Sequence, residues 1–187
     1  YMPGANAEEF YQIAQLAKRY DTPIFVHIRH NEPFGPENNY SSHEEVIALA
    51  AMTGAHMHFC HLNSNATRNI PVMIDAIEKA RSYGLDVTWE AYPYGAASTM
   101  ASAAYLAPDY LRSRWGLDCS AIQYIRTGER LDSLDKWAKL RKDDPAGLIN
   151  AFLLDESKPE DKALLDQAVV HPDAAIASDA VFWQVEA

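Results

Sequence analysis

Three short segments of the chain each end an apolar run with a side chain that can bind a metal ion or move a proton. They are residues 24–29, 58–63 and 175–179, and they carry His27, His61 and Asp179. In α/β barrels the chemistry lies at the C-terminal ends of successive parallel strands. We therefore expect these three side chains to meet in one site although the chain separates them widely. Such a grouping indicates a metal-assisted hydrolase.

The rest of the sequence follows a pattern that is typical of βαβ units and a parallel sheet. The predicted helices cover 7–19, 42–53, 70–83 and 159–169, and the predicted strands cover 24–28, 55–60, 86–90 and 173–178. Capping boxes are expected at Asn6 with Glu9 and at Ser42 with Glu45. The first helix has an expected apolar stripe formed by Phe10, Ile13, Ala14, Ala17 and Tyr20.

The alternation of helices and strands breaks between residues 91 and 159. This stretch contains a loop of small residues, a segment rich in Trp, Tyr and Arg, and a charged helix candidate at 131–141. We interpret 91–159 as an insertion in a late βα loop, either a lid over the catalytic face or a plain surface excursion. Residues 1–187 would then form a single partial barrel domain.

Bulk properties restrict the class of protein. The chain has 187 residues, fewer than the roughly 250 of a complete (β/α)8 barrel, so we expect part of the barrel to lie outside it. Acidic side chains outnumber basic ones 26 to 16, for a net charge of -10, which argues against nucleic acid and favours a small-molecule substrate. A homo-oligomer remains one alternative.

Cysteine usage and hydropathy bear on the compartment. Cys60 and Cys119 form no CxxC pair, which argues against a disulfide framework and a zinc ribbon and favours a reducing, cytoplasmic location. No apolar run approaches the ~20 residues of a membrane span, and residues 1–4 lack the features of a signal peptide. Because the sequence starts at Tyr1 instead of Met, we expect its true beginning upstream.

The candidate site residues each have a chemical role and a structural alternative. Zinc accepts neutral imidazole nitrogen at ~2.0 Å, so His27 and His61 could supply two of its protein ligands. A single strand-end histidine is more often a core or surface residue, and the pair at equivalent strand ends favours the metal. Asp179 suits a metal ligand and a general base that takes a proton from the attacking water. Its structural alternative is a helix or turn cap.

Other polar side chains lie beside these strand ends. Arg29 either pairs with an acidic residue or contacts substrate. Tyr94, or Tyr92 in a shifted register, could donate a hydrogen bond to a substrate carboxylate or to a developing oxyanion, although two tyrosines around a proline can equally pack in a turn. The sequence His-Met-His at 56–58 is interpreted as a coincidence of register, because residues 56 and 58 should point away from the face that carries 57, 59 and 61.

Several of these motifs together resemble the N-acyl-D-amino-acid deacylases (D-aminoacylases) of the amidohydrolase superfamily. In order along the chain they are Tyr1-Met2-Pro3-Gly4-Ala5 with Glu9, His27-Ile28-Arg29, His61-Leu62, Tyr92-Pro93-Tyr94 with Ser98-Thr99, and Ser178-Asp179. Each motif alone is weak, and it is their ordered combination that carries the resemblance.

The resemblance implies that the chain is the second half of a TIM-type (β/α)8 barrel, about strands five to eight. It also implies one or two divalent metal ions, zinc first of all, and hydrolysis of an N-acyl amino acid. The His-x-His of the first strand, the bridging residue of an early strand and the basic residue after the final Asp have no counterpart here. Asn63 stands where the deacylases usually carry a Lys that contacts the substrate carboxylate, which places Asn63 beside the expected substrate.

Three other hypotheses remain open. The enzyme could be a cyclic amidase of the dihydroorotase or hydantoinase kind, acting on a cyclic amide. The chain could instead be a non-catalytic half-barrel that needs the missing half, since open parallel edge strands pair with other chains. A doubly wound small-molecule binding domain is the third, and it leaves the alignment of His27, His61 and Asp179 unexplained.

Overall fold

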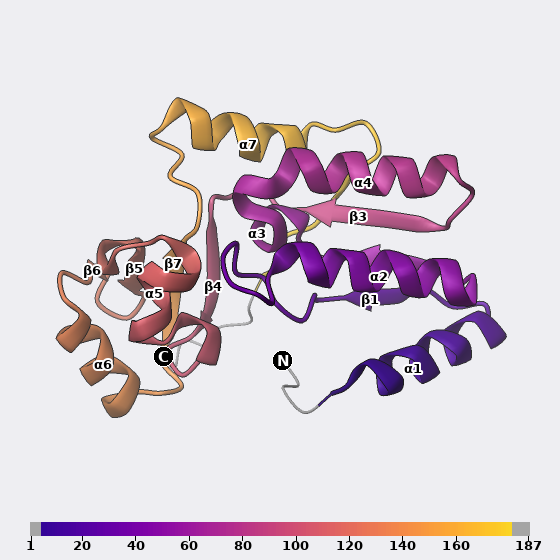
Figure 1. The fold of residues 1–187 in the computed structure, drawn as a ribbon. Coiled ribbons are helices and arrows are strands. Elements are labelled where there is room, and N and C mark those ends of the chain that lie inside the picture. Colours follow the sequence, from indigo (N-terminus) through magenta and orange to yellow (C-terminus); the bar gives the residue numbers. More distant parts are fainter. Residues whose placement is uncertain (1–4, 181–187) are drawn as a thin grey trace, which may run out of the picture.

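The computed structural model describes residues 5–180, so the motif at Tyr1–Gly4 lies outside the described residues. Four parallel strands form the first sheet, in the order β1-β2-β3-β8 (Figure 1). They are β1 (Ile24–Val26), β2 (Met57–Phe59), β3 (Val87–Ala91) and β8 (Ala175–Ile176). The register pairs Val26 with Phe59 and Phe59 with Trp89, so the C-terminal ends of three strands lie at one edge of the sheet.

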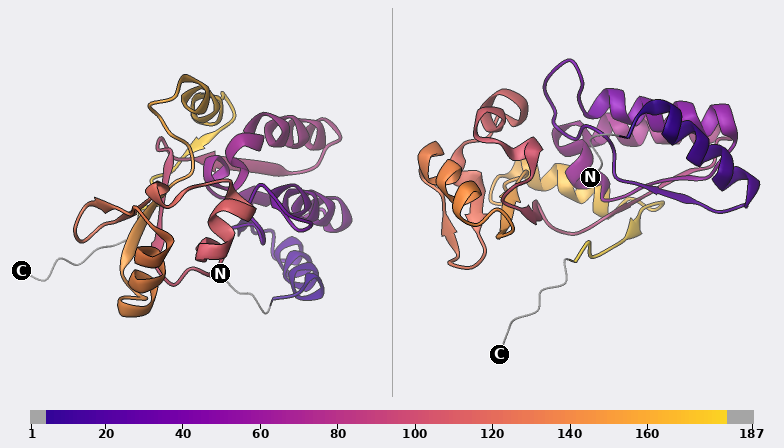
Figure 2. Two further views of the ribbon diagram at one scale, coloured as in Figure 1. Left: turned by 60° about the vertical axis from the view of Figure 1, so that its left-hand side comes forward. Right: turned by 90° about the horizontal axis from the view of Figure 1, so that it is seen from below.

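Helices cover one face of this sheet (Figure 2, right). They are α1 (Ala7–Arg19), α2 (Asn39–Thr53), α3 (Leu62–Ala66), the 3-10 turn η1 (Thr67–Asn69), α4 (Ile70–Ser82) and α7 (Pro159–Val169). Met57, Phe59 and Trp89 point toward them and are fully buried, and Ile77 of α4 completes this core. Alternate residues of each strand thus form the core, and their neighbours lie on the other face.

The other face of the sheet is open among residues 5–180. On that face Phe25 of β1 is 64% exposed, while its neighbour His58 of β2 is 8% exposed. The four strands do not close into a barrel within the described residues. The structure therefore confirms a mixed α/β fold with a parallel sheet, while the assignment to strands five to eight stays a prediction.

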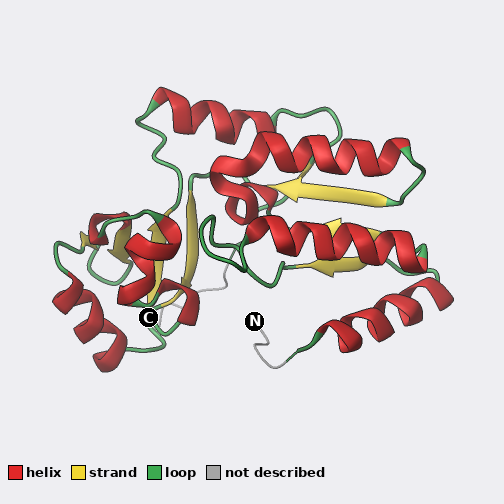
Figure 3. Ribbon diagram, viewed as in Figure 1, coloured by secondary structure: helices red, strands yellow, loops and turns green. Residues whose placement is uncertain are grey.

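Residues 96–152 form a second sheet, which is antiparallel and has the order β4-β7-β5-β6 (Figure 3). Its strands are β4 (Ala96–Met100), β5 (Ile122–Tyr124), β6 (Glu129–Arg130) and β7 (Leu148–Phe152). Between them lie η2 (Ala104–Leu106), α5 (Pro108–Trp115), η3 (Cys119–Ala121) and α6 (Leu134–Asp143). This region buries its own core around Trp137, Ile149 and Leu111.

Helix starts differ locally from the sequence expectation. Asn6 caps α1 as predicted, with its side chain accepting from the Glu9 backbone at 2.8 Å. The capping box of α2 was predicted at Ser42 with Glu45, which is wrong: it lies at Asn38 with Ser41. The Ser42 hydroxyl instead accepts from the His30 backbone.

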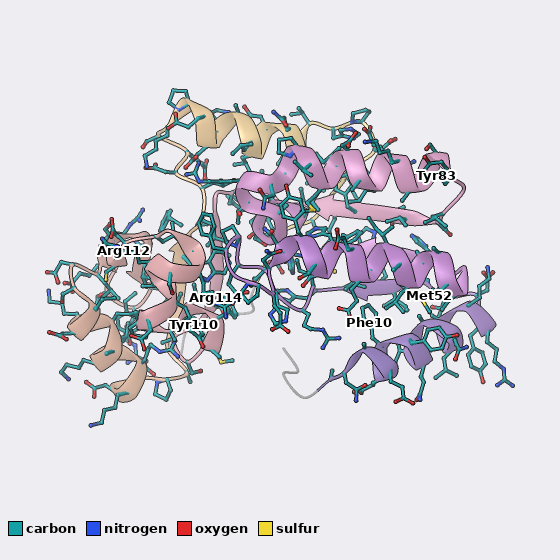
Figure 4. All side chains as sticks on the ribbon, in the orientation of Figure 1. Phe10, Met52, Tyr83, Tyr110, Arg112 and Arg114 are labelled. Atoms are coloured by element: carbon teal, nitrogen blue, oxygen red, sulfur yellow. The ribbon has the colours of Figure 1, made fainter. Side chains whose placement is uncertain are left out.

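The apolar stripe of α1 is only partly buried. Ala14 and Ala17 are buried, whereas Ile13 is 46% and Tyr20 is 70% exposed. Phe10 lies between α1 and α2, and Tyr83 lies at the far end of the α4 region (Figure 4). Across residues 5–180, every helix is too short or too polar to cross a lipid bilayer.

Candidate active site

His27 and His61 come together at the C-terminal edge of the parallel sheet. His27 follows β1 and His61 follows β2, and His27 Nδ1 lies 3.0 Å from His61 Nε2. The two rings meet edge to face, with 4.7 Å between their centroids. The expected meeting of these two strand ends is therefore present, and two imidazole nitrogens converge on one point.

The backbone of His61 explains how its ring reaches His27. Strand β2 ends at Phe59, and His61 has φ 37° and ψ 56°, in the left-handed region. The alternation expected for residues 57, 59 and 61 therefore ends before His61. Asp179 also has a positive φ, of 45°. Left-handed residues other than glycine cost free energy and cluster at functional sites, so two of the three candidates have this signature.

Burial keeps both imidazoles neutral. Burial and the neighbouring His61 lower the pKa of His27 to about 3. Burial also lowers the pKa of His61, although the Asp179 carboxylate opposes this shift in part. A neutral imidazole carries a bare nitrogen at neutral pH, which is the form that binds metal ions.

A cavity between the two sheets contains all three candidate residues. Its wall on the side of the parallel sheet is polar, and its wall on the side of the antiparallel sheet is largely apolar. The lining residues are His27, Asn31, His61, Ser64, Asp179, Ala97, Ser98, Thr99, Tyr105, Leu106, Trp115, Ala151 and Leu153. Asp179 thus shares a cavity with the two histidines.

The two histidines fit a zinc-type ion by their geometry. Two nitrogens held at ~2.0 Å from one tetrahedral ion lie about 3.3 Å apart, and the observed separation of His27 Nδ1 and His61 Nε2 is 3.0 Å. Within the part of the chain that the structure describes, no group of three or more His, Cys, Asp or Glu side chains is close enough to hold a metal ion. The described residues thus bring together two nitrogen ligands, and a complete metal site would need further ligands.

Cys60 precedes His61 and is half-buried. Burial raises the pKa of its thiol to about 11, with Glu90 and Asp179 adding to the shift. The thiol is therefore protonated at neutral pH, and this state makes it a poor nucleophile.

Asn63 joins the end of β2 to the segment after β3. The Asn63 side chain donates to the Tyr94 carbonyl at 3.1 Å and accepts from the Tyr92 backbone N–H at 3.2 Å. Asn63 is 2% exposed and is absent from the cavity lining. Its amide thus positions the Tyr-Pro-Tyr turn, and its expected contact with substrate stays a prediction.

The two tyrosines of this turn lie differently. Tyr92 is 2% exposed, its ring is 6.5 Å from that of His61, and it is absent from the cavity lining. Burial raises the pKa of Tyr92, so its phenol keeps its proton. Tyr94 is 57% exposed.

Arg29 lies outside the cavity lining and forms an ion pair. Its guanidinium contacts both carboxylate oxygens of Glu45, at 3.0 and 3.2 Å, and also the Ala5 carbonyl. The side-chain hydrogen bond with Glu45 raises the pKa of Arg29. These contacts fasten the start of α1 and the end of β1 to α2.

Sequence reasoning did not single out Ser64, Trp115 or Leu106, which also line the cavity. Ser64 could have been found, since it lies three residues after His61 on a helical turn, a spacing that brings side chains together. Trp115 and Leu106 reach the cavity only through the packing of the antiparallel sheet, and no local pattern marks them.

The fold is similar to part of several solved deacylase and aminoacylase structures. No family model and no curated protein matches the sequence, and the fold class rests on solved structures. D-aminoacylase, described as defining a novel subset of amidohydrolases, superposes with a TM-score of 0.65 at 18% identity.

An N-acyl-D-glutamate deacylase from Bordetella bronchiseptica, complexed with zinc and a phosphonate inhibitor, gives 0.63 at 22% identity. A D-aminoacylase described by its binuclear metal center gives 0.60 at 20% identity. Each superposition covers 94% of this chain and 36% of the solved chain, so the chain spans about a third of the length of the structures it matches.

Proposed function

We propose that this chain carries part of the active site of a metal-dependent amidohydrolase that cleaves a non-peptide C–N amide bond, most nearly an N-acyl-D-amino-acid deacylase. The observation that carries the proposal is the 3.0 Å approach of His27 Nδ1 to His61 Nε2, in a cavity that Asp179 also lines. The parallel strands would be about strands five to eight of a barrel. Residues 91–159 would be the insertion over its catalytic face.

The metal ligands would include His27 and His61, with Asp179 as a further candidate. Both imidazoles are neutral, so each can offer a lone pair without first losing a proton. Zinc is the proposed metal, with one or two ions, because it accepts nitrogen ligands in this geometry. When bound, such an ion supplies Lewis acidity at the amide carbonyl and acidifies nearby water.

Asp179 is the proposed general base and general acid. Its carboxylate would take a proton from the attacking water and deliver that proton to the departing nitrogen. Tyr92 is the proposed hydrogen-bond donor to the tetrahedral oxyanion, because its buried phenol keeps its proton and its ring lies 6.5 Å from that of His61. Tyr94 stays a candidate for contact with the outer part of the substrate.

The substrate would be a small N-acyl amino acid, with a cyclic amide as the alternative. The lining combines neutral polar groups with Leu106, Trp115 and Leu153, which suits an amide that carries an apolar acyl or side-chain group. No Lys or Arg side chain lines the described cavity. An anionic substrate group would need a cation from elsewhere.

The metal content of the purified protein tests this function. We expect near-stoichiometric zinc by elemental analysis of the gene-length product, that is, the protein encoded by the whole gene. The zinc should be lost in His27→Ala and in His61→Ala. It should be kept in the control His171→Ala, because His171 does not line the cavity. Asp179→Asn should keep metal through the two imidazoles and lose nearly all turnover. Absence of metal from the gene-length product would overturn the proposal, and an active Asp179→Asn variant would remove Asp179 from the mechanism.

A second candidate is a non-catalytic half-barrel that associates with other chains. Its specific support is the face of the parallel sheet away from the helices, where Phe25 is 64% exposed. A parallel sheet with open edges pairs readily with further strands. This candidate predicts concentration-dependent association without hydrolysis.

A further inference from the structure

The first turn after His61 forms a small hydrogen-bonded network around its ring. His61 Nδ1 lies 3.2 Å from Ser64 Oγ, and Ser64 Oγ lies 3.1 Å from the His61 carbonyl oxygen. Ser64 is 7% exposed and His61 is 9% exposed. Water therefore has little access to this pair, and its proton positions are set mainly by the protein.

The donor and acceptor inventory restricts the proton positions. A serine hydroxyl has one proton to donate and lone pairs to accept. A carbonyl oxygen can only accept, and the Ser64 hydroxyl donates its proton to the His61 carbonyl at 3.1 Å, beside the backbone N–H groups of Ser64 and Asn65 at 3.0 and 3.2 Å. Ser64 Oγ then accepts from His61, which places the imidazole proton on Nδ1.

Asn65 holds the same turn from the other side. It is fully buried, and its side chain donates to the Cys60 carbonyl at 2.8 Å, just before the left-handed residue His61. Its backbone N–H donates to the His61 carbonyl at 3.2 Å. The carbonyl oxygens of residues 60 and 61 are thus both fixed, and this supports the unusual backbone conformation of His61.

We propose that Ser64 is a positioning residue that holds His61 in the Nδ1–H tautomer and so presents a bare Nε2 toward His27. In this state His61 Nε2 accepts from His27 Nδ1 at 3.0 Å in the metal-free chain. A shift of the His27 proton to its other ring nitrogen would leave both facing nitrogens bare for an ion. The partner of the second ring nitrogen commonly fixes the tautomer of a ligating histidine. The expected effect on metal binding rests on the proposed function, whereas the tautomer of His61 is a property of the protein alone.

Nitrogen-15 NMR of the histidine side chains tests the proposal directly. Two-bond proton–nitrogen correlation spectra, recorded on this chain without metal at slightly alkaline pH, distinguish a protonated from a bare ring nitrogen. His61→Gln identifies the His61 signals by their loss. We expect His61 to show a protonated Nδ1 and a bare Nε2 in the wild-type chain; the opposite tautomer overturns the proposal whatever the variants do.

Substitutions of Ser64 then test whether its hydroxyl sets the tautomer of His61. Ser64→Ala should shift the His61 tautomer population markedly toward Nε2–H, and Ser64→Thr, which keeps the hydroxyl, should restore the wild-type pattern. Ser113→Ala is the matched control, because its hydroxyl also bonds a carbonyl within a helix, that of Asp109, but lies far from His61 in the chain. An unchanged His61 pattern in Ser64→Ala overturns the role of Ser64.

Zinc titration of the gene-length product distinguishes failure of the positioning role of Ser64 from failure of the proposed function. Loss of a partner to a ligating histidine typically weakens metal binding 10–100-fold, and we expect about that change in Ser64→Ala. If the wild type binds no zinc while His61 keeps the Nδ1–H tautomer, the proposed function fails and the positioning role stands. If zinc binds with equal affinity to wild type and Ser64→Ala, the positioning role has no effect on the site and this consequence of the proposal fails.

Discussion

Arg68 and Asp161 lie 93 residues apart in the chain and form an ion pair with 2.7 Å between Arg68 Nη1 and an Asp161 carboxylate oxygen. The Asp161 side chain is 2% exposed, and it also accepts from the Asp155 backbone N–H at 2.9 Å. The pair joins η1, just after the His61 turn, to α7. It thus ties the last described helix to the region of the candidate site.

Removal of the Asp161 carboxylate should destabilise the fold. We expect Asp161→Ala to lower the free energy of unfolding by about 2–3 kcal/mol, because Arg68 and the Asp155 N–H lose a buried charged acceptor. Urea denaturation measures the change. Asp166→Ala in the same helix is the control: its ion pair with Lys162 is exposed and should contribute only about 0.5 kcal/mol. Equal effects of the two variants would show that the Arg68 pair adds nothing specific.

Acid should weaken the fold through His43. This side chain is stacked on Phe59 with 4.8 Å between ring centroids, and burial lowers the pKa of His43 to about 4 from an ordinary value of 6.5. A histidine that binds its proton more weakly when folded costs no stability above pH 6.5. Stability is lost as the pH falls from 6.5 toward 4, by up to about 3 kcal/mol.

His43→Phe keeps an aromatic ring at this position and removes its titration. We expect the wild type to lose more stability than this variant when thermal or urea unfolding is compared at pH 7 and pH 4.5. His27 and His61 add to the pH dependence of both proteins equally. Identical pH profiles would exclude His43 as a contributor.

The left-handed backbone at His61 predicts that glycine is more stable than alanine at this position, the reverse of their order inside a helix. His61→Gly and His61→Ala both remove the imidazole, but only glycine adopts this conformation without a steric cost. We expect His61→Gly to be more stable than His61→Ala by about 1 kcal/mol. Glu44, exposed in the interior of α2, is the control, and there Glu44→Gly should be less stable than Glu44→Ala by about 1 kcal/mol. The same order at both positions would argue against the backbone conformation of His61.

Loss of the Asn63 amide should loosen the Tyr-Pro-Tyr turn. We expect Asn63→Ala to cost about 1–2 kcal/mol, because two hydrogen bonds to the backbone of residues 92 and 94 are lost. The Tyr92 amide should exchange its hydrogen faster, and hydrogen exchange by NMR measures this. The Leu117 amide, which donates to the Leu111 carbonyl in the second core, should be unaffected. An unchanged Tyr92 exchange rate would contradict the positioning role of Asn63.

The open sheet face should promote association of this chain. We expect sedimentation velocity to show an average mass that rises with concentration, and Phe25→Lys to reduce this rise by replacing an exposed aromatic side chain with a charge. Tyr83→Lys is the control, since Tyr83 is 84% exposed but lies at the end of α4, away from the open face. A concentration-independent monomer, or equal effects of the two variants, would speak against the half-barrel candidate.

The parallel half of the fold could be predicted from the sequence because its signals are local. The apolar runs at 24–28 and 55–60 contain β1 and β2, the run at 86–90 overlaps β3 in all but its last residue, and Asn6 caps its helix as expected. The approach of His27 to His61 also follows, since neighbouring parallel strands end at one edge of a sheet.

The antiparallel sheet could not be predicted because its pairings are not local. Ser98 of β4 faces Asn150 of β7, 52 residues further along the chain, and no short-range pattern specifies that register. The left-handed backbone at His61 could not be predicted from the sequence either, because histidine has only a weak preference for that region. The capping box of α2 was misplaced because Asn38 and Ser41 compete with Ser42 and Glu45 for the same role.

The two sheets bury separate hydrophobic cores, yet both contribute walls to one cavity. Substitutions at Leu106, Trp115 or Leu153 alter the apolar wall and leave the packing around Phe59 and Trp89 untouched. Mutations that are far apart and share no partners act additively on stability. The shape of the cavity can therefore change by substitution in one core while the histidine pair on the other sheet is kept.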